Sequence, residues 1–198
     1  LKQITLAIAF LMALTTSVFS QDFNKGLAAA QTGDFATALQ EWRPLAEQGD
    51  ASAQFNLALM YSNGMGVLQD DAEAAKWYLR AAEQGNASAQ NNLGLMYRKG
   101  NGVLQDDAEA AKWYLRAAEQ GNASAQNNLG LMYRKGNGVL QDDAEAVKWF
   151  RMAAEQGDAQ AQTNLGFMYH YGKGVLKDNT MAHMWYNIGS ANGNDLGA

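Results

Sequence analysis

The chain has 198 residues, a formal net charge of −5, 20 glycines, one proline and no cysteine. Its 15 lysine and arginine residues are outnumbered by 20 aspartate and glutamate residues, which argues against a nucleic-acid partner because such binding depends on clustered cations. The lack of cysteine excludes disulfides, so side-chain packing has to supply the stability.

Residues 1–20 have the pattern of a secretory signal. Lys2 precedes an apolar run, Ile4–Leu14, and small or polar residues lead to an expected cleavage after Ser20. The run is shorter than the roughly 20 apolar residues that a membrane span needs. We therefore predict an exported protein, periplasmic or secreted, that does not insert into a membrane after cleavage. An uncleaved anchor is the alternative.

The segment 21–49 is predicted to be a degenerate helix pair that caps the fold at its N-terminal end. Its second half places four residues on one helical face: Ala38, Trp42, Leu45 and Ala46. Pro44 lies inside this pattern and lacks the amide hydrogen that would bond to the residue four positions back. We therefore expect a kink or an early helix end at Pro44.

From residue 50 onward the chain consists of tandem repeats. Gln69–Leu104 and Gln105–Leu140 are identical over 36 residues, and Gln141–Leu176 is a diverged copy. A unit that can be duplicated whole contacts mainly its neighbours, which is typical of a solenoid. The pattern predicts four repeats, at 50–85, 86–121, 122–157 and 158–193. Residues 194–198 are then the start of a truncated further helix, so we expect a missing C-terminal cap, with a natural stop as the alternative.

Each repeat is predicted to hold two antiparallel helices, A and B. Helix A carries an apolar stripe at i, i+4, i+7 and i+8, formed in the first repeat by Ala53, Leu57, Met60 and Tyr61. Helix B sets small residues beside aromatic rings, as in Ala74, Trp77, Tyr78, Ala81 and Ala82. Its tryptophans are interpreted as core residues rather than as platforms for sugars; these are Trp77, Trp113 and Trp149.

The motifs Ala-x-Ala-Gln-x-Asn-Leu-Gly-x-Met-Tyr, Gly-x-Gly-Val and Ala-x-x-Trp-Tyr-x-x-Ala-Ala-x-x-Gly recur over Asp50–Gly193. They resemble the Sel1-like repeat (SLR) family, a branch of the tetratricopeptide-like (TPR-like) helical repeats. The resemblance implies an all-α, right-handed superhelical solenoid of antiparallel helix pairs, with the A helices lining its concave side. It also implies a role as an adaptor in protein complexes. Some secreted relatives hold each repeat with a disulfide, which this chain cannot form.

The four A helices can be compared with one another within the chain. Five positions recur in every repeat and cover an arc of about 140°, which predicts the packed face; in the first repeat they are Ala53, Asn56, Leu57, Met60 and Tyr61. The variable positions cover an arc of about 80°. They are Ser52, Phe55, Leu59, Ser62, Ser88, Asn91, Leu95, Arg98, Ser124, Asn127, Leu131, Arg134, Gln160, Thr163, Phe167 and His170.

With the geometry that the resemblance implies, these variable positions are the candidate protein-binding groove. An apolar row along them favours binding, because a contiguous apolar row on a solvated face is typical of interaction sites; it consists of Leu59, Leu95, Leu131 and Phe167. The alternative is that these positions face solvent and vary without any function.

The recurring polar motifs do not indicate catalysis. The Gly-x-Gly motif follows a helix and lacks a Gly-Lys-Ser/Thr continuation, so we interpret it as a turn with positive φ rather than a phosphate site. His170 and His183 have no metal-ligand spacing. Acidic pairs such as Asp70 and Asp71 stand where B helices begin and are interpreted as helix caps. We expect no catalytic residue, no cofactor and no metal.

The resulting hypothesis is a non-enzymatic, exported adaptor that holds a protein or peptide segment in its concave groove. One alternative is a module that binds cell-wall peptidoglycan through its asparagine-rich stripe. A second alternative, a hydrolase acting on cell-wall or β-lactam substrates, rests on family analogy alone.

Overall fold

The structure is a computed structural model that describes residues 22–193. Within this range the chain is all-α, as predicted, and forms ten helices. Their bounds are α2 (Phe23–Gln31), α3 (Phe35–Glu47), α4 (Ala51–Asn63), α5 (Asp71–Glu83), α6 (Ala87–Lys99), α7 (Asp107–Glu119), α8 (Ala123–Lys135), α9 (Asp143–Glu155), α10 (Ala159–Tyr171) and α11 (Asn179–Ala191). The segments interpreted as a secretory signal and as the start of a further helix lie outside the described residues.

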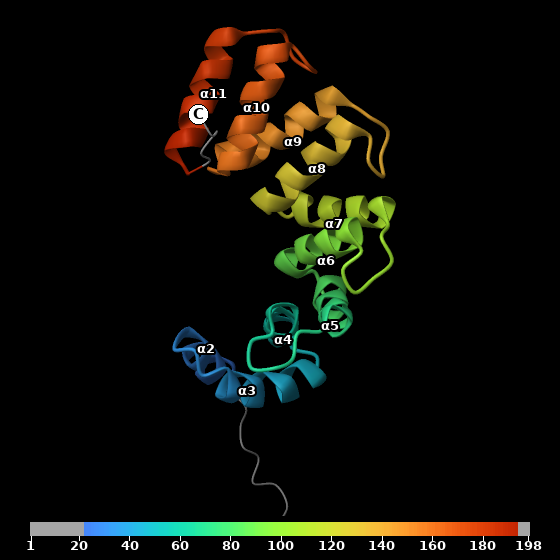
Figure 1. The fold of residues 1–198 in the computed structure, drawn as a ribbon, viewed down its shortest axis with the longest axis vertical. Coiled ribbons are helices and arrows are strands. Elements are labelled where there is room, and N and C mark those ends of the chain that lie inside the picture. The colour runs from blue at the N-terminus through green and yellow to red at the C-terminus, as the bar shows by residue number, and fades with distance from the viewer. Residues whose placement is uncertain (1–21, 194–198) are drawn as a thin grey trace, which may run out of the picture.

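The helices stack in chain order into an elongated, curved arc, with α2 and α11 at opposite ends (Figure 1). Each helix packs mainly against the helix before it and the helix after it, which is the arrangement expected of a solenoid. The even-numbered helices from α4 to α10 are the predicted A helices, and the odd-numbered helices from α5 to α11 are the predicted B helices. No helix within residues 22–193 has the length and apolarity to cross a membrane.

Polar side chains determine where the helices begin. The A helices are capped by side-chain oxygens that accept a hydrogen bond from a backbone amide three residues further on; the capping residues are Asp50, Asn86, Asn122 and Asp158. The B helices are capped by one aspartate in each repeat: Asp70, Asp106, Asp142 and Asp178. The interpretation of the acidic pairs as helix caps is therefore confirmed.

The Gly-x-Gly-Val loop turns the chain from helix A to helix B and also touches the preceding repeat. In the second repeat its first glycine, Gly100, ends α6 with a φ of 72°. Its second glycine, Gly102, has a φ of 68°, and a Cβ added there would stand 2.2 Å from the carbonyl carbon of Asp71. Glycine fits both the left-handed conformation and this close approach. The turn interpretation is confirmed, and the loop also docks on the first turn of the preceding B helix.

The core consists of alanines that alternate with aromatic rings. Trp77, Trp113 and Trp149 are buried, which confirms their interpretation as core residues. In α6, α8 and α10 a glycine of helix A faces an aromatic ring of helix B, whereas α4 has the buried Ala58 at this position. A Cβ added to Gly94 would stand 2.9 Å from the ring of Tyr114, so a methyl group there would require the ring to shift.

A buried glutamine in every A helix links three helices. Its amide nitrogen donates to a carbonyl at the end of the preceding B helix, as in Gln126 to Ala118 at 3.1 Å. Its amide oxygen accepts from the residue that ends the following B helix, as in Gln156 to Gln126 at 2.7 Å. The equivalent buried residues are Gln54, Gln90 and Gln162. These glutamines give the helix-end carbonyls a second hydrogen bond, beside the one from a backbone amide, and have their own buried amides satisfied in return.

The segment before the first repeat forms the helix pair α2 and α3. Trp42 of α3 is buried, and its indole nitrogen donates to the carbonyl of Phe23 at 3.2 Å. The early helix end expected at Pro44 is wrong, because α3 continues to Glu47. Pro44 stands only three residues before this end, so its missing amide costs a single hydrogen bond, and the next turn is held by the buried Ala46.

Candidate functional site

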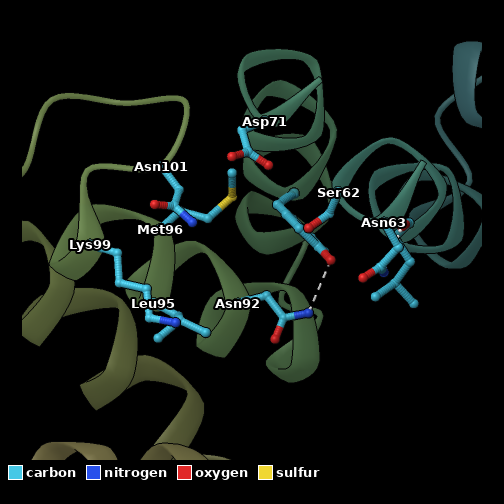
Figure 2. A pocket seen from close by; sticks show the side chains of 10 residues that line it. Ser62, Asn63, Asp71, Asn92, Leu95, Met96, Lys99 and Asn101 are labelled. Carbon is cyan, nitrogen blue, oxygen red and sulfur yellow. Dashed lines mark hydrogen bonds between the residues drawn. The ribbon is translucent and has the colours of Figure 1, made fainter. Parts of the chain in front are cut away.

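Two hollows of the same design lie between successive A helices. The first hollow lies between α4 and α6, beside α5, and has a volume of about 200 Å³. It is lined by Leu59, Ser62, Asn63, Asp71, Tyr78, Asn92, Leu95, Met96, Lys99 and Asn101. Figure 2 shows Ser62 and Asn63 across the hollow from Lys99 and Asn101.

The second hollow lies one repeat further along the arc, between α6 and α8. It has a volume of about 260 Å³ and is lined by Arg98, Leu131, Met132, Lys135 and Asn137. The last four occupy the positions that line the first hollow 36 residues earlier, and Arg98 takes the position of Ser62. The hollow is therefore a property of the repeat rather than of one place in the chain.

Each hollow combines an apolar floor with a cation at its rim. In the first, half-buried Leu95 lies over the buried Met96, and the exposed Lys99 shares the lining with one carboxylate, Asp71. In the second, Lys135 is exposed and Arg98 is half-buried, and none of the described residues that line it is acidic. The second hollow is accordingly the more positive of the two.

All sixteen predicted groove residues lie on the A helices, but they differ in exposure and in contacts. One in each repeat is exposed at the start of the helix: Ser52, Ser88, Ser124 and Gln160. The apolar row is half-buried and packs partly against the core; it consists of Leu59, Leu95, Leu131 and Phe167. Of this row, Leu59 and Leu95 line the first hollow and Leu131 lines the second.

The remaining eight predicted residues divide between the hollows and the contacts between helices. Ser62 lines the first hollow and Arg98 the second, whereas His170 is exposed at the end of α10. Arg134 donates to the side-chain oxygen of Asn164 at 3.3 Å and lies 5.2 Å above the ring of Phe167. Phe55, Asn91, Asn127 and Thr163 occupy the equivalent position of the four A helices. Phe55 and Thr163 lie beside helix B of their own repeat, whereas Asn91 and Asn127 contact the next repeat.

The expectation that this last position faces an open groove is wrong for Asn127, which is buried. Its side-chain oxygen accepts from Asn164 at 2.9 Å, and one repeat earlier Asn91 accepts from Asn128 at 3.1 Å. These hydrogen bonds join successive A helices. The side-chain oxygens of Asn91 and Asn127, which belong to the stripe on which the peptidoglycan alternative depends, therefore already accept hydrogen bonds within the protein.

The invariant asparagine that was assigned to the packed face lies at the hollow instead. Asn92 is half-buried and lines the first hollow, where its amide donates to the hydroxyl of Tyr78 at 3.1 Å (Figure 2). Burial is the main reason that the pKa of Tyr78 lies above its usual value, although this hydrogen bond lowers it in part. Phe55, at a ring distance of 6.0 Å from Tyr78, offers no amide that would compete for Asn92.

Tyr114, the counterpart of Tyr78 in the identical unit 105–140, has a different hydrogen-bond pattern. Because Asn128 donates to Asn91, it does not serve Tyr114, whose hydroxyl is buried without a hydrogen-bond partner among the described residues. Burial raises the pKa of Tyr114 to about 12, with a smaller lowering effect from Arg98. In the third repeat the equivalent residue is Phe150, which has no hydroxyl. Two differences between the repeats, Phe55 against Asn91 and Ser62 against Arg98, thus change the environment of the tyrosine in the next helix.

Sequence reasoning missed several residues that line the hollows, notably Met96, Lys99, Asn101 and their counterparts Met132, Lys135 and Asn137. The signal that could have found them is the pair of exposed cations at the end of two successive A helices. Chemically, the hollows can accept an apolar side chain beside a carboxylate. Within residues 22–193 no group of three histidine, aspartate or glutamate side chains is placed to hold a metal ion, and His170 and His183 lie on separate helices.

The fold and the repeated hollows define an α-helical repeat protein of the solenoid class. The Sel1 repeat profile matches residues 51–86, 87–122, 123–158 and 159–194, beginning one residue later than the boundaries drawn from the sequence. The chain therefore belongs to the Sel1 repeat family, which confirms the resemblance.

Two solved SLR structures are similar to this chain over most of its length. The Sel1 repeat protein from Oxalobacter formigenes is 37% identical with a TM-score of 0.81, covering 87% of this chain and 71% of its own. The protective antigen c5321 of uropathogenic Escherichia coli is 47% identical with a TM-score of 0.76, covering 79% of this chain but 33% of its own.

A curated relative is the exopolysaccharide production negative regulator of Rhizobium leguminosarum bv. viciae, 41% identical over 56 residues. This match spans 28% of the present chain and 21% of the regulator. The present chain thus matches only about a fifth of that protein's length and a third of c5321.

Proposed function

We propose that the protein is a non-enzymatic adaptor that binds an extended peptide or protein segment across its A helices. The observation that carries this proposal is the recurrence of one hollow, with an apolar floor and a cationic rim, at two successive repeat junctions. Repeat arrays commonly bind extended segments because their surfaces recur with the period of the array. Membership of the Sel1 repeat family supports the same role.

The chemistry of the hollows indicates the kind of segment. Half-buried Leu95 and Leu131, each backed by a buried methionine, offer two patches for apolar side chains. The cations beside them favour carboxylates, both in steering the encounter and in discriminating against basic segments. The preferred ligand is therefore a segment with apolar residues followed by aspartate or glutamate.

The test is binding of labelled peptides that share apolar residues and carry either aspartates or lysines next to them. We expect the acidic set to bind and the double variant Lys99→Glu, Lys135→Glu to bind it at least about tenfold more weakly. The matched control is the double variant Lys76→Glu, Lys112→Glu, which makes the same charge change on the exposed sides of α5 and α7. Equal affinity for both peptide sets, or an unaffected double variant, would contradict the proposal.

The peptidoglycan alternative is decided by sedimentation with purified peptidoglycan. Co-sedimentation that the double variant does not weaken would transfer the function from the hollows to another surface.

We further propose that the protein is exported, on the strength of the apolar run in residues 1–20. Cell fractionation and N-terminal sequencing of the protein test this. A mature chain that begins at Gln21 supports export, and a cytoplasmic protein with an intact Leu1 contradicts it.

A further inference from the structure

A row of exposed leucines runs along the loops that join helix A to helix B. Each of the four loops carries one, directly after the valine of Gly-x-Gly-Val: Leu68, Leu104, Leu140 and Leu176. Each is 91% exposed, whereas the valines before them are half-buried. In Figure 1 the loops from α6 to α7 and from α8 to α9 project from the same side of the arc. We refer to the four residues as the leucine row.

Packing does not explain why these leucines recur. Leu104 and Leu140 belong to identical copies, but the loops of the first and fourth repeats have diverged elsewhere: Gln69 corresponds to Lys177 and Asp71 to Asn179. Single exposed leucines are ordinary on protein surfaces, whereas a repeated apolar position on solvated loops indicates an interaction surface.

The residues that follow the leucine row make the same loops acidic. In the first three loops the leucine is followed, after one glutamine, by two aspartates: Asp70 and Asp71, Asp106 and Asp107, and Asp142 and Asp143. The first of each pair caps a B helix and is exposed. A leucine followed by carboxylates is the chemistry that we propose the hollows select.

The hollows lie beside the loops that carry the leucine row, and both are spaced by one repeat. Asn101 of the first hollow belongs to the loop that carries Leu104, and Asn137 of the second hollow belongs to the loop that carries Leu140. The leucine row has one member in each 36-residue repeat, and the two hollows lie one repeat apart, so the spacing of one matches the spacing of the other in a second molecule. Because they lie on one edge, a two-fold related pair can present both surfaces at once, as an isologous interface requires.

We propose that the occupant of the hollows is a second copy of this chain, whose exposed leucines enter the apolar floors while its aspartates face the cationic rims. The second hollow, lined by Arg98 and Lys135, suits this partner best. The proposal rests on the proposed function, since it names a partner for the same hollows. Bound in this way, the copies compete with any external segment, so self-association and ligand binding exclude each other.

The experiment is sedimentation equilibrium of the purified protein up to about 100 μM, a range that captures weak specific interfaces. We expect association that weakens when the salt concentration is raised from about 0.05 to 0.5 M, because the charges of the interface are screened. The double variant Leu104→Ser, Leu140→Ser should associate at least about tenfold more weakly. The control Gln105→Ser, Gln141→Ser, in the same loops, should associate like the parent.

The charge contribution is tested separately with Asp106→Asn, Asp142→Asn. Asparagine keeps the helix caps, so these variants lose the charges without losing the fold, and we expect weaker association with less dependence on salt. A protein that is monomeric at about 100 μM in low salt, or one whose association is indifferent to the leucine variant, would overturn the proposal.

Peptide binding at concentrations where the protein is monomeric separates this inference from the proposed function. The leucine variant should bind the acidic peptides like the parent, because its hollows are intact. The variant Lys99→Glu, Lys135→Glu should lose both activities. Peptide binding without self-association would overturn the inference alone, and self-association without peptide binding would overturn the proposed function alone.

Discussion

Replacing Tyr114 with phenylalanine should stabilise the protein, whereas the same replacement at Tyr78 should destabilise it. The two tyrosines occupy the same position in consecutive repeats, but their hydroxyls differ in hydrogen bonding. The hydroxyl of Tyr78 accepts from Asn92 at 3.1 Å, while that of Tyr114 is buried without a partner among the described residues. The third repeat already carries Phe150 at this position, so the site accepts a ring without the hydroxyl.

The magnitudes follow from the hydrogen bonds. A buried polar group without a partner costs about 1–3 kcal/mol, so Tyr114→Phe should raise the free energy of unfolding by about 1–2 kcal/mol. Tyr78→Phe removes one satisfied hydrogen bond and should lower it by about 0.5–1.5 kcal/mol. For a domain of this size, 1 kcal/mol corresponds to a shift of about 2–4 °C in Tm.

Equilibrium urea denaturation followed by circular dichroism measures both effects. A Tyr114→Phe variant that unfolds at lower urea concentration than the parent would refute the reasoning, because it would show that the hydroxyl has a stabilising partner. A useful control is Asn91→Ala, which frees Asn128 to reach Tyr114. In that background Tyr114→Phe should lose its stabilising effect.

The pKa of the same tyrosine predicts a loss of stability at alkaline pH. Its folded-state pKa of about 12 lies above the ordinary value of 10.0 because burial opposes the phenolate. A raised pKa contributes stability that is complete below pH 10 and is lost as the pH rises toward 12. Once the pH exceeds both values, the loss amounts to about 2–3 kcal/mol. Denaturation at pH 9 and pH 11.5 should show that the free energy of unfolding decreases less between these pH values in Tyr114→Phe than in the parent.

Two further predictions concern the repeats as building blocks. Gln126→Leu removes both hydrogen bonds of a buried amide, one to the carbonyl of Ala118 and one from the side chain of Gln156, and should cost about 1–3 kcal/mol in urea denaturation. Gln120→Ala removes the exposed partner of the equivalent link to Gln90 and should cost less than about 1 kcal/mol. Equal costs would show that the buried amide is not decisive. Deleting 105–140 joins two junctions that already exist, so the protein should fold with unchanged helicity per residue and an m-value lower by about a fifth; an unfolded product would contradict the repeat description.

The helices and most of the packed face could be predicted from the sequence alone. The spacing of Ala53, Leu57 and Met60 located helix A, and all three residues are buried in the structure. Caps and glycines marked the ends of the helices. These features could be predicted because they depend on residues within one or two turns of each other, where the helical period fixes the geometry.

The sequence also contained signals that were open to more than one interpretation. Gln54 and its equivalents recur directly after the second alanine of each A helix. The role of a polar residue on a buried face can be assigned only when its hydrogen-bond partners are known. Each exposed leucine follows a half-buried valine, and no sequence pattern distinguishes the surroundings of these two apolar residues.

The pairing of polar atoms between repeats and the positions of the hollows depend on how the helices pack in the folded chain. Asn128 donates to Asn91 across 37 positions of the chain, and Asn92 turns to Tyr78 because the previous repeat offers Phe55 instead. Identical repeats therefore present different sites, since each junction depends on side chains from both neighbours. The hollows arise in the same way, because their walls come from consecutive helices whose separation and tilt are set by packing rather than by the period of either helix.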